Sequence, residues 1–208
     1  MYVSFKDYNC IGLLGGTFNP VHLGHLMMAE AAYNQVDDIE KIVFMPNNKT
    51  AYKDNEEIEN QRHRLNMLQL ATEEYDFAGI SDIEVNRGGV TYTVDTLREI
   101  IHINPDIKVY FIIGADSLYT FTKWRDFEEV LRMCTLLVVN RESSYVKLKE
   151  TGDYLACTYG ADIRLLNTEE FDASSTEIRQ KIKNGICVSD KLPEKVLQYI
   201  RDNGLYKQ

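Results

Sequence analysis

Short apolar runs alternate along the chain with longer segments whose apolar residues recur at the spacing of a helix. The short runs predict strands at residues 10–15, 41–46, 80–85, 108–113, 135–140 and 162–166, and most are too uniformly apolar for strands with one face in water. The periodic segments predict helices at residues 23–34, 61–75, 94–103, 126–132, 176–183 and 193–202. This alternation predicts an α/β fold, a mostly parallel sheet with helices on both faces. Ligands of such sheets bind at the carboxyl ends of the strands, where the strand order reverses.

The composition is that of an ordinary globular protein. The 208 residues are 44% apolar and 26% charged, which excludes a disordered chain, a collagen and a disulfide scaffold. We expect a single domain over residues 1–208, with the helices from about residue 172 packed on it. The net charge of −9 argues against nucleic-acid and anionic-membrane partners, but it leaves room for a locally positive phosphate site.

The sequence predicts a cytoplasmic protein. No run approaches the roughly 18 apolar residues of a membrane-spanning helix, and residues 1–8 lack the basic and apolar regions of a signal peptide. The cysteines, which are Cys10, Cys134, Cys157 and Cys187, form no CxxC pair and no metal-site spacing. We therefore expect free thiols in a reducing compartment.

One long segment, residues 47–60, has no clear period. It holds Lys49 and Lys53, followed by an acidic run at residues 54–59. A loop of this length in a compact domain is either functional or a solvated surface segment, and the sequence leaves both interpretations open.

The first candidate for chemistry follows the first predicted strand, in the sequence GGTFNPVHLGH at residues 15–25. Gly15 and Gly16 allow the backbone to pass close to a ligand without a Cβ clash. His22 and His25 are three residues apart, so they share one face of the first helical turn, whose free N–H groups favour an anion. Two imidazoles at such a point suit an anion whose charge grows in a transition state, as in nucleotidyl transfer.

Two other interpretations of this histidine pair are weaker. A zinc pair on a helix needs a spacing of four and a third ligand, for which the sequence offers no good candidate. A structural role is the commoner case for a lone histidine, but two histidines directly after a Gly-Gly turn favour a functional role.

A second anion site is predicted in the sequence DASSTEIR at residues 172–179. Ser174 and Glu177 have the spacing of a capping box, so we expect Ser174 to cap the helix that follows. Hydroxyl groups at a helix start, followed by Arg179, are also suited to binding phosphate.

Three further segments place polar residues beside predicted strands and helices. TYTVDTL at residues 91–97 has the chemistry of a helix start. GADSL at residues 114–118 follows a strand, where a glycine and Asp116 can approach a nucleotide and its ribose. KWR at residues 123–125 holds the only tryptophan, Trp124, which is suited to stacking on a flat ring, although a single tryptophan is more often part of a core.

Together these segments resemble a known family. GGTFNPVHLGH is similar to the GGxFDPxHxGH signature of the HxGH nucleotidyltransferase superfamily, and SSTEIR is similar to its SSTxIR motif. The YTVDTL, GADSL and KW segments resemble the bacterial nicotinate-nucleotide adenylyltransferases within that superfamily, and the resemblance spans residues 10–199. It implies a Rossmann-like domain that joins ATP and nicotinate mononucleotide into deamido-NAD and pyrophosphate, in NAD biosynthesis.

The resemblance also implies a role for each matching residue. His25, supported by His22, would stabilise the charge on the α-phosphate of ATP. The ATP-binding residues would be Gly15, Gly16, Thr17, Phe18, Gly24, Ser175, Thr176 and Arg179. The mononucleotide-binding residues would be Thr93, Gly114, Asp116, Trp124, Lys53 and Arg141, with Trp124 stacked on the pyridine ring. Mg²⁺ would be held mainly by the ATP phosphates, without a protein metal site.

Two positions depart from the family pattern. Asn19 stands where Asp is commoner, which removes a charge but keeps an acceptor, so we expect activity to survive. The sequence Ala51-Tyr52-Lys53 stands where Pro-His-Lys is common, so the lysine is kept and the histidine is not.

Alternative functions remain open at this point. A related transferase for nicotinamide mononucleotide differs by one exchange of carboxylate for amide, which the sequence does not resolve. Thr93 and Trp124 argue against phosphopantetheine, which has no flat ring. A nucleotide-binding regulator without catalysis is disfavoured because both histidines and Arg179 are present. The sequence is compatible with a homo-oligomer but does not define the oligomeric state.

Overall fold

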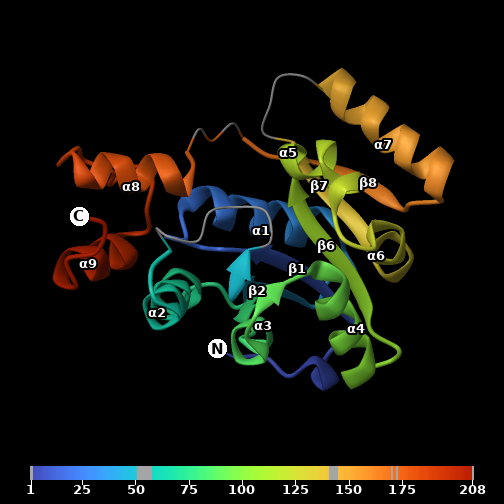
Figure 1. The fold of residues 1–208 in the computed structure, drawn as a ribbon, viewed down its shortest axis with the longest axis horizontal. Helices are drawn as coiled ribbons and strands as arrows, with labels where there is room; N and C mark the ends of the chain where they lie inside the picture. Colours follow the sequence, from blue (N-terminus) through green and yellow to red (C-terminus); the bar gives the residue numbers. More distant parts are fainter. Residues whose placement is uncertain (1, 51–57, 141–144, 170, 172, 208) are drawn as a thin grey trace.

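The main sheet is parallel throughout and forms the centre of the molecule (Figure 1). The computed structural model describes residues 2–50, 58–140, 145–169, 171 and 173–207. The strands of the main sheet are β1 (Cys10–Gly16), β2 (Lys41–Pro46), β4 (Ala78–Ile80), β6 (Lys108–Gly114), β7 (Thr135–Asn140) and β8 (Ile163–Asn167). A second, two-stranded sheet pairs β3 (Lys49–Thr50) with β5 (Val90–Thr91).

Helices connect most of these strands. They are α1 (Leu23–Gln35), α2 (Gln61–Thr72), α3 (Ile83–Arg87), α4 (Thr93–Ile103), α5 (Ala115–Tyr119), α6 (Phe127–Met133), α7 (Tyr145–Tyr159), α8 (Ser175–Lys183) and α9 (Glu194–Asp202). Two 3₁₀ turns lie at Phe5–Asp7 and Phe121–Lys123. No helix in the described ranges is long and apolar enough to cross a membrane.

The strand order is β4-β2-β1-β6-β7-β8, so the chain builds outward from β1 in one direction and then returns to build outward in the other. The reversal lies between β1 and β6, which pair in parallel with Leu14 opposite Ile112. The crevice at the carboxyl ends of two such strands is the usual ligand site of a doubly wound sheet. The predicted α/β fold, with a parallel sheet covered by helices on both faces, is confirmed.

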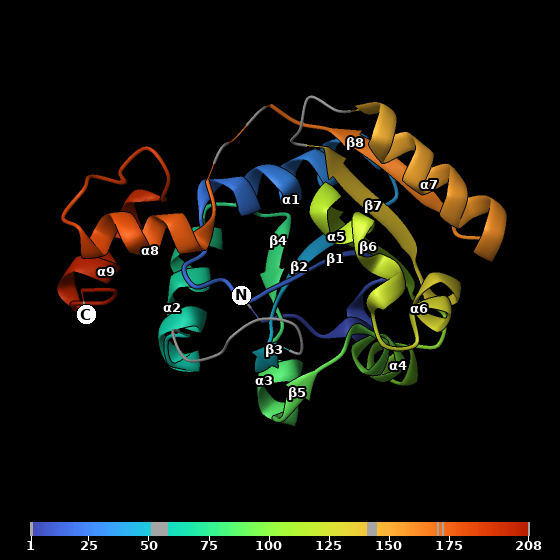
Figure 2. The same ribbon diagram turned by 45° about the horizontal axis from the view of Figure 1, so that its top comes forward.

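The core has two layers, one on each face of the sheet. Because successive side chains of a strand point to opposite faces, Leu14 packs in one layer and Leu13 in the other. Helices α1, α2, α8 and α9 cover the first face, and α4, α5, α6 and α7 cover the second. Figure 2 shows α8 and α9 beside α2, and α7 alongside the edge strand β8.

The predicted strand at residues 80–85 is wrong. Strand β4 ends at Ile80, and residues 83–87 form the short helix α3. Ile83 and Val85 alternate with polar residues as in a strand, but the backbone of Asn86 donates to the carbonyl of Asp82, as in a helical turn. Helix α7 was not predicted from the sequence. Its buried face is formed by Leu148, Gly152 and Leu155, which recur at helical spacing.

Candidate active site

Two adjoining cavities open at the carboxyl ends of β1 and β6, where the strand order reverses. The larger has a volume of about 740 Å³ and the smaller about 470 Å³. Both are lined by Gly15, Gly16, Thr17, Thr50, Phe111, Asp116, Ser117 and Trp124. The shared wall makes them two parts of one cleft, large enough for two small substrates side by side.

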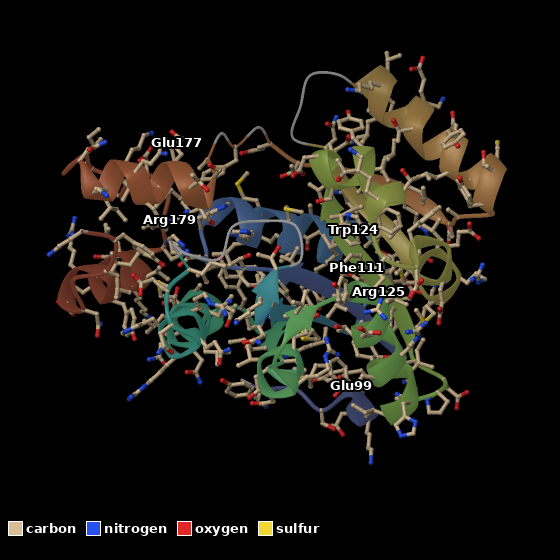
Figure 3. All side chains as sticks on the ribbon, viewed as in Figure 1. Glu99, Phe111, Trp124, Arg125, Glu177 and Arg179 are labelled. Atoms are coloured by element: carbon tan, nitrogen blue, oxygen red, sulfur yellow. The ribbon has the colours of Figure 1, made fainter. Side chains whose placement is uncertain are left out.

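The larger cavity collects most of the residues predicted to bind ATP. Its wall includes Gly15, Gly16, Thr17, Phe18, His25, Ser175, Thr176 and Arg179. The first loop and the start of α8 therefore face the same space, although they are far apart in the sequence. Figure 3 shows Arg179 on the α8 side of this cleft and Trp124 on the opposite side.

The two histidines differ in their surroundings. His22 is the N-cap of α1 and is only 3% exposed, while His25, one turn later, is half-buried on the wall of the larger cavity. Their ring centroids lie 3.8 Å apart, and Nδ1 of His25 accepts a hydrogen bond of 3.2 Å from the backbone N–H of His22. A nitrogen that accepts carries no proton, so the neutral His25 ring carries its proton on Nε2 and can donate from there.

His22 and Gly24 line neither cavity. The ring of His22 stacks on Phe171 with a centroid separation of 6.2 Å. A Cβ on Gly24 would lie 2.8 Å from the ring of Phe171 and 3.1 Å from that of His22. Gly24 therefore leaves room for the two rings to stack beside α1, and the predicted contact of Gly24 with ATP has no support from this geometry.

Asn19 joins the first loop to α8, to the segment before α2 and to the chain after α9. Its carbonyl accepts from Nη1 of Arg179 at 3.0 Å, and its side-chain Oδ1 accepts from the hydroxyl of Tyr206 at 2.9 Å and the N–H of Glu59 at 3.2 Å. The hydroxyl of Ser175 donates to the carbonyl of Pro20 at 2.9 Å. The amide oxygen of Asn19 thus serves as the acceptor that the commoner aspartate would also provide.

The start of α8 has the predicted cap. The hydroxyl oxygen of Ser174 accepts from the backbone N–H of Glu177 at 3.2 Å. The cap leaves Ser175 and Thr176 in the first turn on the cavity wall. The helix begins one residue earlier than predicted, at Ser175.

Arg64, which the sequence analysis missed, holds the loops behind the cleft together. It is fully buried and donates to the carbonyls of Thr17 and Asn47, both at 2.8 Å, and to that of Glu59 at 3.3 Å. Burial lowers the pKa of this guanidinium from its ordinary value. The signal was present in the sequence, because Arg64 occupies the same helix face as Met67, Leu68 and Ala71, where a charge needs buried partners.

The smaller cavity collects part of the predicted mononucleotide site. Thr93, Asp116 and Trp124 line it, whereas Gly114 lines the larger cavity. Lys53 and Arg141 lie outside the described residues. The indole of Trp124 stacks on Phe121 with centroids 4.8 Å apart and meets Phe111 edge-on at 6.1 Å.

Glu84, whose carboxyl group is buried, is a second residue at the cleft that was not predicted from the sequence. Glu84 lines the smaller cavity and accepts a hydrogen bond of 2.6 Å from Thr96, whose hydroxyl accepts from Arg87 at 2.8 Å. Burial raises the pKa of Glu84 to about 7, against the lowering effect of the Thr96 hydrogen bond and the Arg87 charge. The predicted strand at residues 80–85 carries no signal for a buried carboxyl group at Glu84.

The described residues contain no group of three or more His, Cys, Asp or Glu side chains that could hold a metal ion. Asp116 is the only carboxylate among the described residues on the wall of the larger cavity. This donor set fits a divalent ion that takes most of its ligands from substrate phosphates, because Mg²⁺ commonly binds through one carboxylate together with phosphates and water.

Comparison with known proteins agrees with the sequence motifs. A family profile described as Cytidylyltransferase-like matches residues 13–181. A curated relative from Lachnoclostridium phytofermentans, named a probable nicotinate-nucleotide adenylyltransferase, is 38% identical over 201 residues, which is 94% of this chain and 98% of the relative. A relative of the same name from Listeria monocytogenes is 40% identical over 196 residues, covering 94% and 96%.

Solved structures share the fold. The nicotinic acid mononucleotide adenylyltransferase of Plasmodium falciparum in complex with NaAD superposes with a TM-score of 0.78 at 18% identity, covering 96% of this chain and 98% of that one. The same protein in complex with APC gives a TM-score of 0.77. At this identity the likeness supports the arrangement of strands and helices alone.

Proposed function

Because the chain belongs to the Cytidylyltransferase-like family and, within it, to the nicotinate-nucleotide adenylyltransferases, we propose that it joins ATP and nicotinate mononucleotide into deamido-NAD and pyrophosphate. The observation that supports this reaction best is the divided cleft. Its larger part has phosphate-binding chemistry on two sides, and its smaller part has a flat aromatic wall. The reaction belongs to NAD biosynthesis.

The larger cavity is proposed to hold ATP. Gly15 and Gly16 let the backbone approach the nucleotide, while Thr176 and Arg179 face the β- and γ-phosphates from α8. The hydrogen bonds from Ser175 and Arg179 join the two walls to each other, and the hydrogen bond from Tyr206 joins the first loop to the chain after α9. They also support our proposal that residues 1–208 form one domain.

The chemistry needs no covalent intermediate. An oxygen of the mononucleotide phosphate attacks the α-phosphorus of ATP. The bond between the α-phosphorus and the oxygen that bridges it to the β-phosphorus breaks, and pyrophosphate leaves with the electron pair of that bond. Nε2–H of His25 donates to an α-phosphate oxygen as its charge grows. His22 keeps the imidazole of His25 in place through its backbone N–H and the contact of the two rings.

A divalent ion, Mg²⁺ in our proposal, would neutralise the triphosphate and polarise its phosphorus. Asp116 is the residue of the larger cavity that could contribute a ligand to this ion. The other ligands would be phosphate oxygens and water.

The proposed reaction is tested by measuring pyrophosphate release from ATP with nicotinate mononucleotide and, separately, with nicotinamide mononucleotide. We expect turnover with the nicotinate compound and much slower turnover with the amide. Faster turnover with the amide would favour the related nicotinamide enzyme. No release with either compound would leave a nucleotide-binding protein without this activity.

Replacing Trp124 by alanine is expected to raise KM for the mononucleotide about tenfold or more, and to change KM for ATP much less. The pyridine ring would lose a stacking surface worth about 0.5–1.5 kcal/mol in addition to its buried area. Initial-rate kinetics with each substrate varied in turn measure both constants. Because Trp124 also stacks on the buried ring of Phe121, equal changes in the two constants would assign it to the core instead.

A further inference from the structure

Helix α9 ends in a Schellman turn, and Tyr206 follows directly after it. The N–H of Leu205 donates to the carbonyl of Ile200 at 3.0 Å, and the N–H of Gly204 donates to the carbonyl of Arg201 at 3.2 Å. These two hydrogen bonds define the motif, and Gly204 takes its left-handed conformation with a φ of 62°. The side chain of Leu205 is buried in the core, so the turn gives Tyr206 a fixed position.

The hydroxyl of Tyr206 donates to Oδ1 of Asn19 at 2.9 Å, and a strained backbone lies on each side of this hydrogen bond. Phe18, which directly precedes Asn19, has a φ of 49°, and Tyr206 has a φ of 62°. Bulky residues adopt a left-handed backbone only where surrounding contacts offset its cost in free energy. The conformation of the first loop therefore depends on the contacts that hold Phe18 and Asn19 from outside the loop.

Asn19 is the point where three other segments meet the wall of the larger cavity. It is only 2% exposed, and Oδ1 accepts from Tyr206 and from the N–H of Glu59 at 3.2 Å. Its carbonyl accepts from Nη1 of Arg179 at 3.0 Å. Phe18, Asn19 and Arg179 line the larger cavity but not the smaller one. Contacts that fix Asn19 therefore act on the half of the cleft that is proposed to hold ATP.

The hydroxyl of Tyr206 is suited to holding Asn19 because it remains a donor. Burial raises the pKa of Tyr206 above the ordinary value of tyrosine, and the charge of Glu59 acts in the same direction, against Arg179 and Arg64. The phenol therefore stays protonated at neutral and moderately alkaline pH, and a protonated phenol can donate to an amide oxygen.

On the basis of the proposed function, we propose that Tyr206 is a positioning residue for ATP. Its hydroxyl fixes the side chain of Asn19, and Asn19 in turn holds the first loop and Arg179 in the arrangement that binds the triphosphate. Tyr206 lines neither cavity, so it acts through Asn19 and not by contact with a substrate.

The substitution Tyr206→Phe removes the hydroxyl and keeps the ring. We expect KM for ATP to rise about threefold to tenfold, the factor that corresponds to one hydrogen bond, and KM for nicotinate mononucleotide to change less than about twofold. Isothermal titration calorimetry with ATP and Mg²⁺ should show the same rise in Kd. This second measurement needs no turnover and no mononucleotide.

The matched control is Tyr199→Phe. The hydroxyl of Tyr199 accepts from Nδ2 of Asn66 at 2.8 Å and is hydrogen-bonded to Nδ1 of His63 at 2.9 Å, so it joins α9 to α2 without lining either cavity. Each substitution deletes one partly buried hydroxyl, so we expect each to lower Tm by about 2–4 °C. Only Tyr206→Phe should change KM or Kd for ATP.

A double-mutant cycle tests whether Tyr206 acts through Asn19. In the background of Asn19→Ala, which lacks the acceptor, adding Tyr206→Phe should raise KM for ATP by less than about twofold. In the background of Asn19→Asp, which keeps the acceptor, it should again raise KM about threefold to tenfold. Equal effects of Tyr206→Phe in the two backgrounds would contradict a role through Asn19. If Asn19→Ala does not fold, the Asn19→Asp background and the Tyr199 control decide.

The inference about Tyr206 is overturned by an unchanged KM and Kd for ATP in Tyr206→Phe, or by an equal change in Tyr199→Phe. Failure of the proposed function looks different: the unaltered protein would bind ATP but release no pyrophosphate with nicotinate mononucleotide. In that case the calorimetric comparison of the two variants still decides the role of Tyr206. An unaltered protein that did not bind ATP would contradict both proposals.

Discussion

Replacing His25 by alanine is expected to lower kcat by about 10²–10³, the usual loss when one preorganised donor to a growing negative charge is removed. The hydrogen bond from the His22 backbone leaves Nε2 of His25 as the donor, and His25 lies on the wall of the larger cavity. The loss should appear in kcat more than in KM, because the charge develops mainly in the transition state. Pyrophosphate release at saturating substrates measures it.

The structure predicts that His25→Ala also lowers the free energy of unfolding. Alanine removes the acceptor for the His22 N–H at the start of α1, which costs about 1 kcal/mol of unfolding free energy. His25→Gln is the matched control, because a glutamine at this third helical position can accept the same hydrogen bond. We expect His25→Gln to recover stability and to stay as slow as His25→Ala. If glutamine restored turnover, the imidazole would have no role in the reaction.

Replacing Arg64 by leucine is expected to lower the unfolding free energy by about 3–5 kcal/mol. Three partly buried carbonyls, those of Thr17, Asn47 and Glu59, would lose the donor that Arg64 provides, and a polar group left unsatisfied costs about 1–3 kcal/mol. The removal of a buried charge offsets part of this cost. Chemical denaturation followed by circular dichroism gives the difference.

Arg62→Leu is the control for this experiment. Arg62 lies on the same helix α2, but its side chain is exposed, so its replacement should change stability by less than about 0.5 kcal/mol. Equal effects of the two substitutions would mean that the carbonyl contacts of Arg64 contribute little. Activity should also fall in Arg64→Leu, because Thr17 and Asn47 both line the smaller cavity.

Local patterns in the sequence predicted most of the helices and strands and the two segments that we propose to bind phosphate. The strands around Leu13, Val43 and Phe111 are apolar on both faces, and such runs identify a covered parallel sheet. The cap at Ser174 depends on neighbouring residues, so it was predicted correctly. The strand at residues 80–85 failed because a two-residue alternation in a short segment does not distinguish a strand from a single helical turn.

The roles of individual residues within the motifs depend on contacts between distant segments. His22 and His25 look equivalent in the sequence, yet Phe171 and Gly24 bury His22 while His25 reaches the cavity. Gly24 belongs to the motif, but in the structure it makes room for two rings. The burial of His22 and the role of Gly24 cannot be predicted from spacing within the motif. Both depend on Phe171, which precedes α8 in the chain.

The sequence by itself determined most of the strands and helices, the glycine turn, the paired histidines and the capped helix start, since each depends on residues within a few positions of one another. Only the tertiary structure decided that the two segments proposed to bind phosphate share one cavity and that Arg64 is buried and donates to three carbonyls. It also decided that Trp124 lies on the wall that the two cavities share. Most of these contacts join segments that are distant in sequence, and no local periodicity records them.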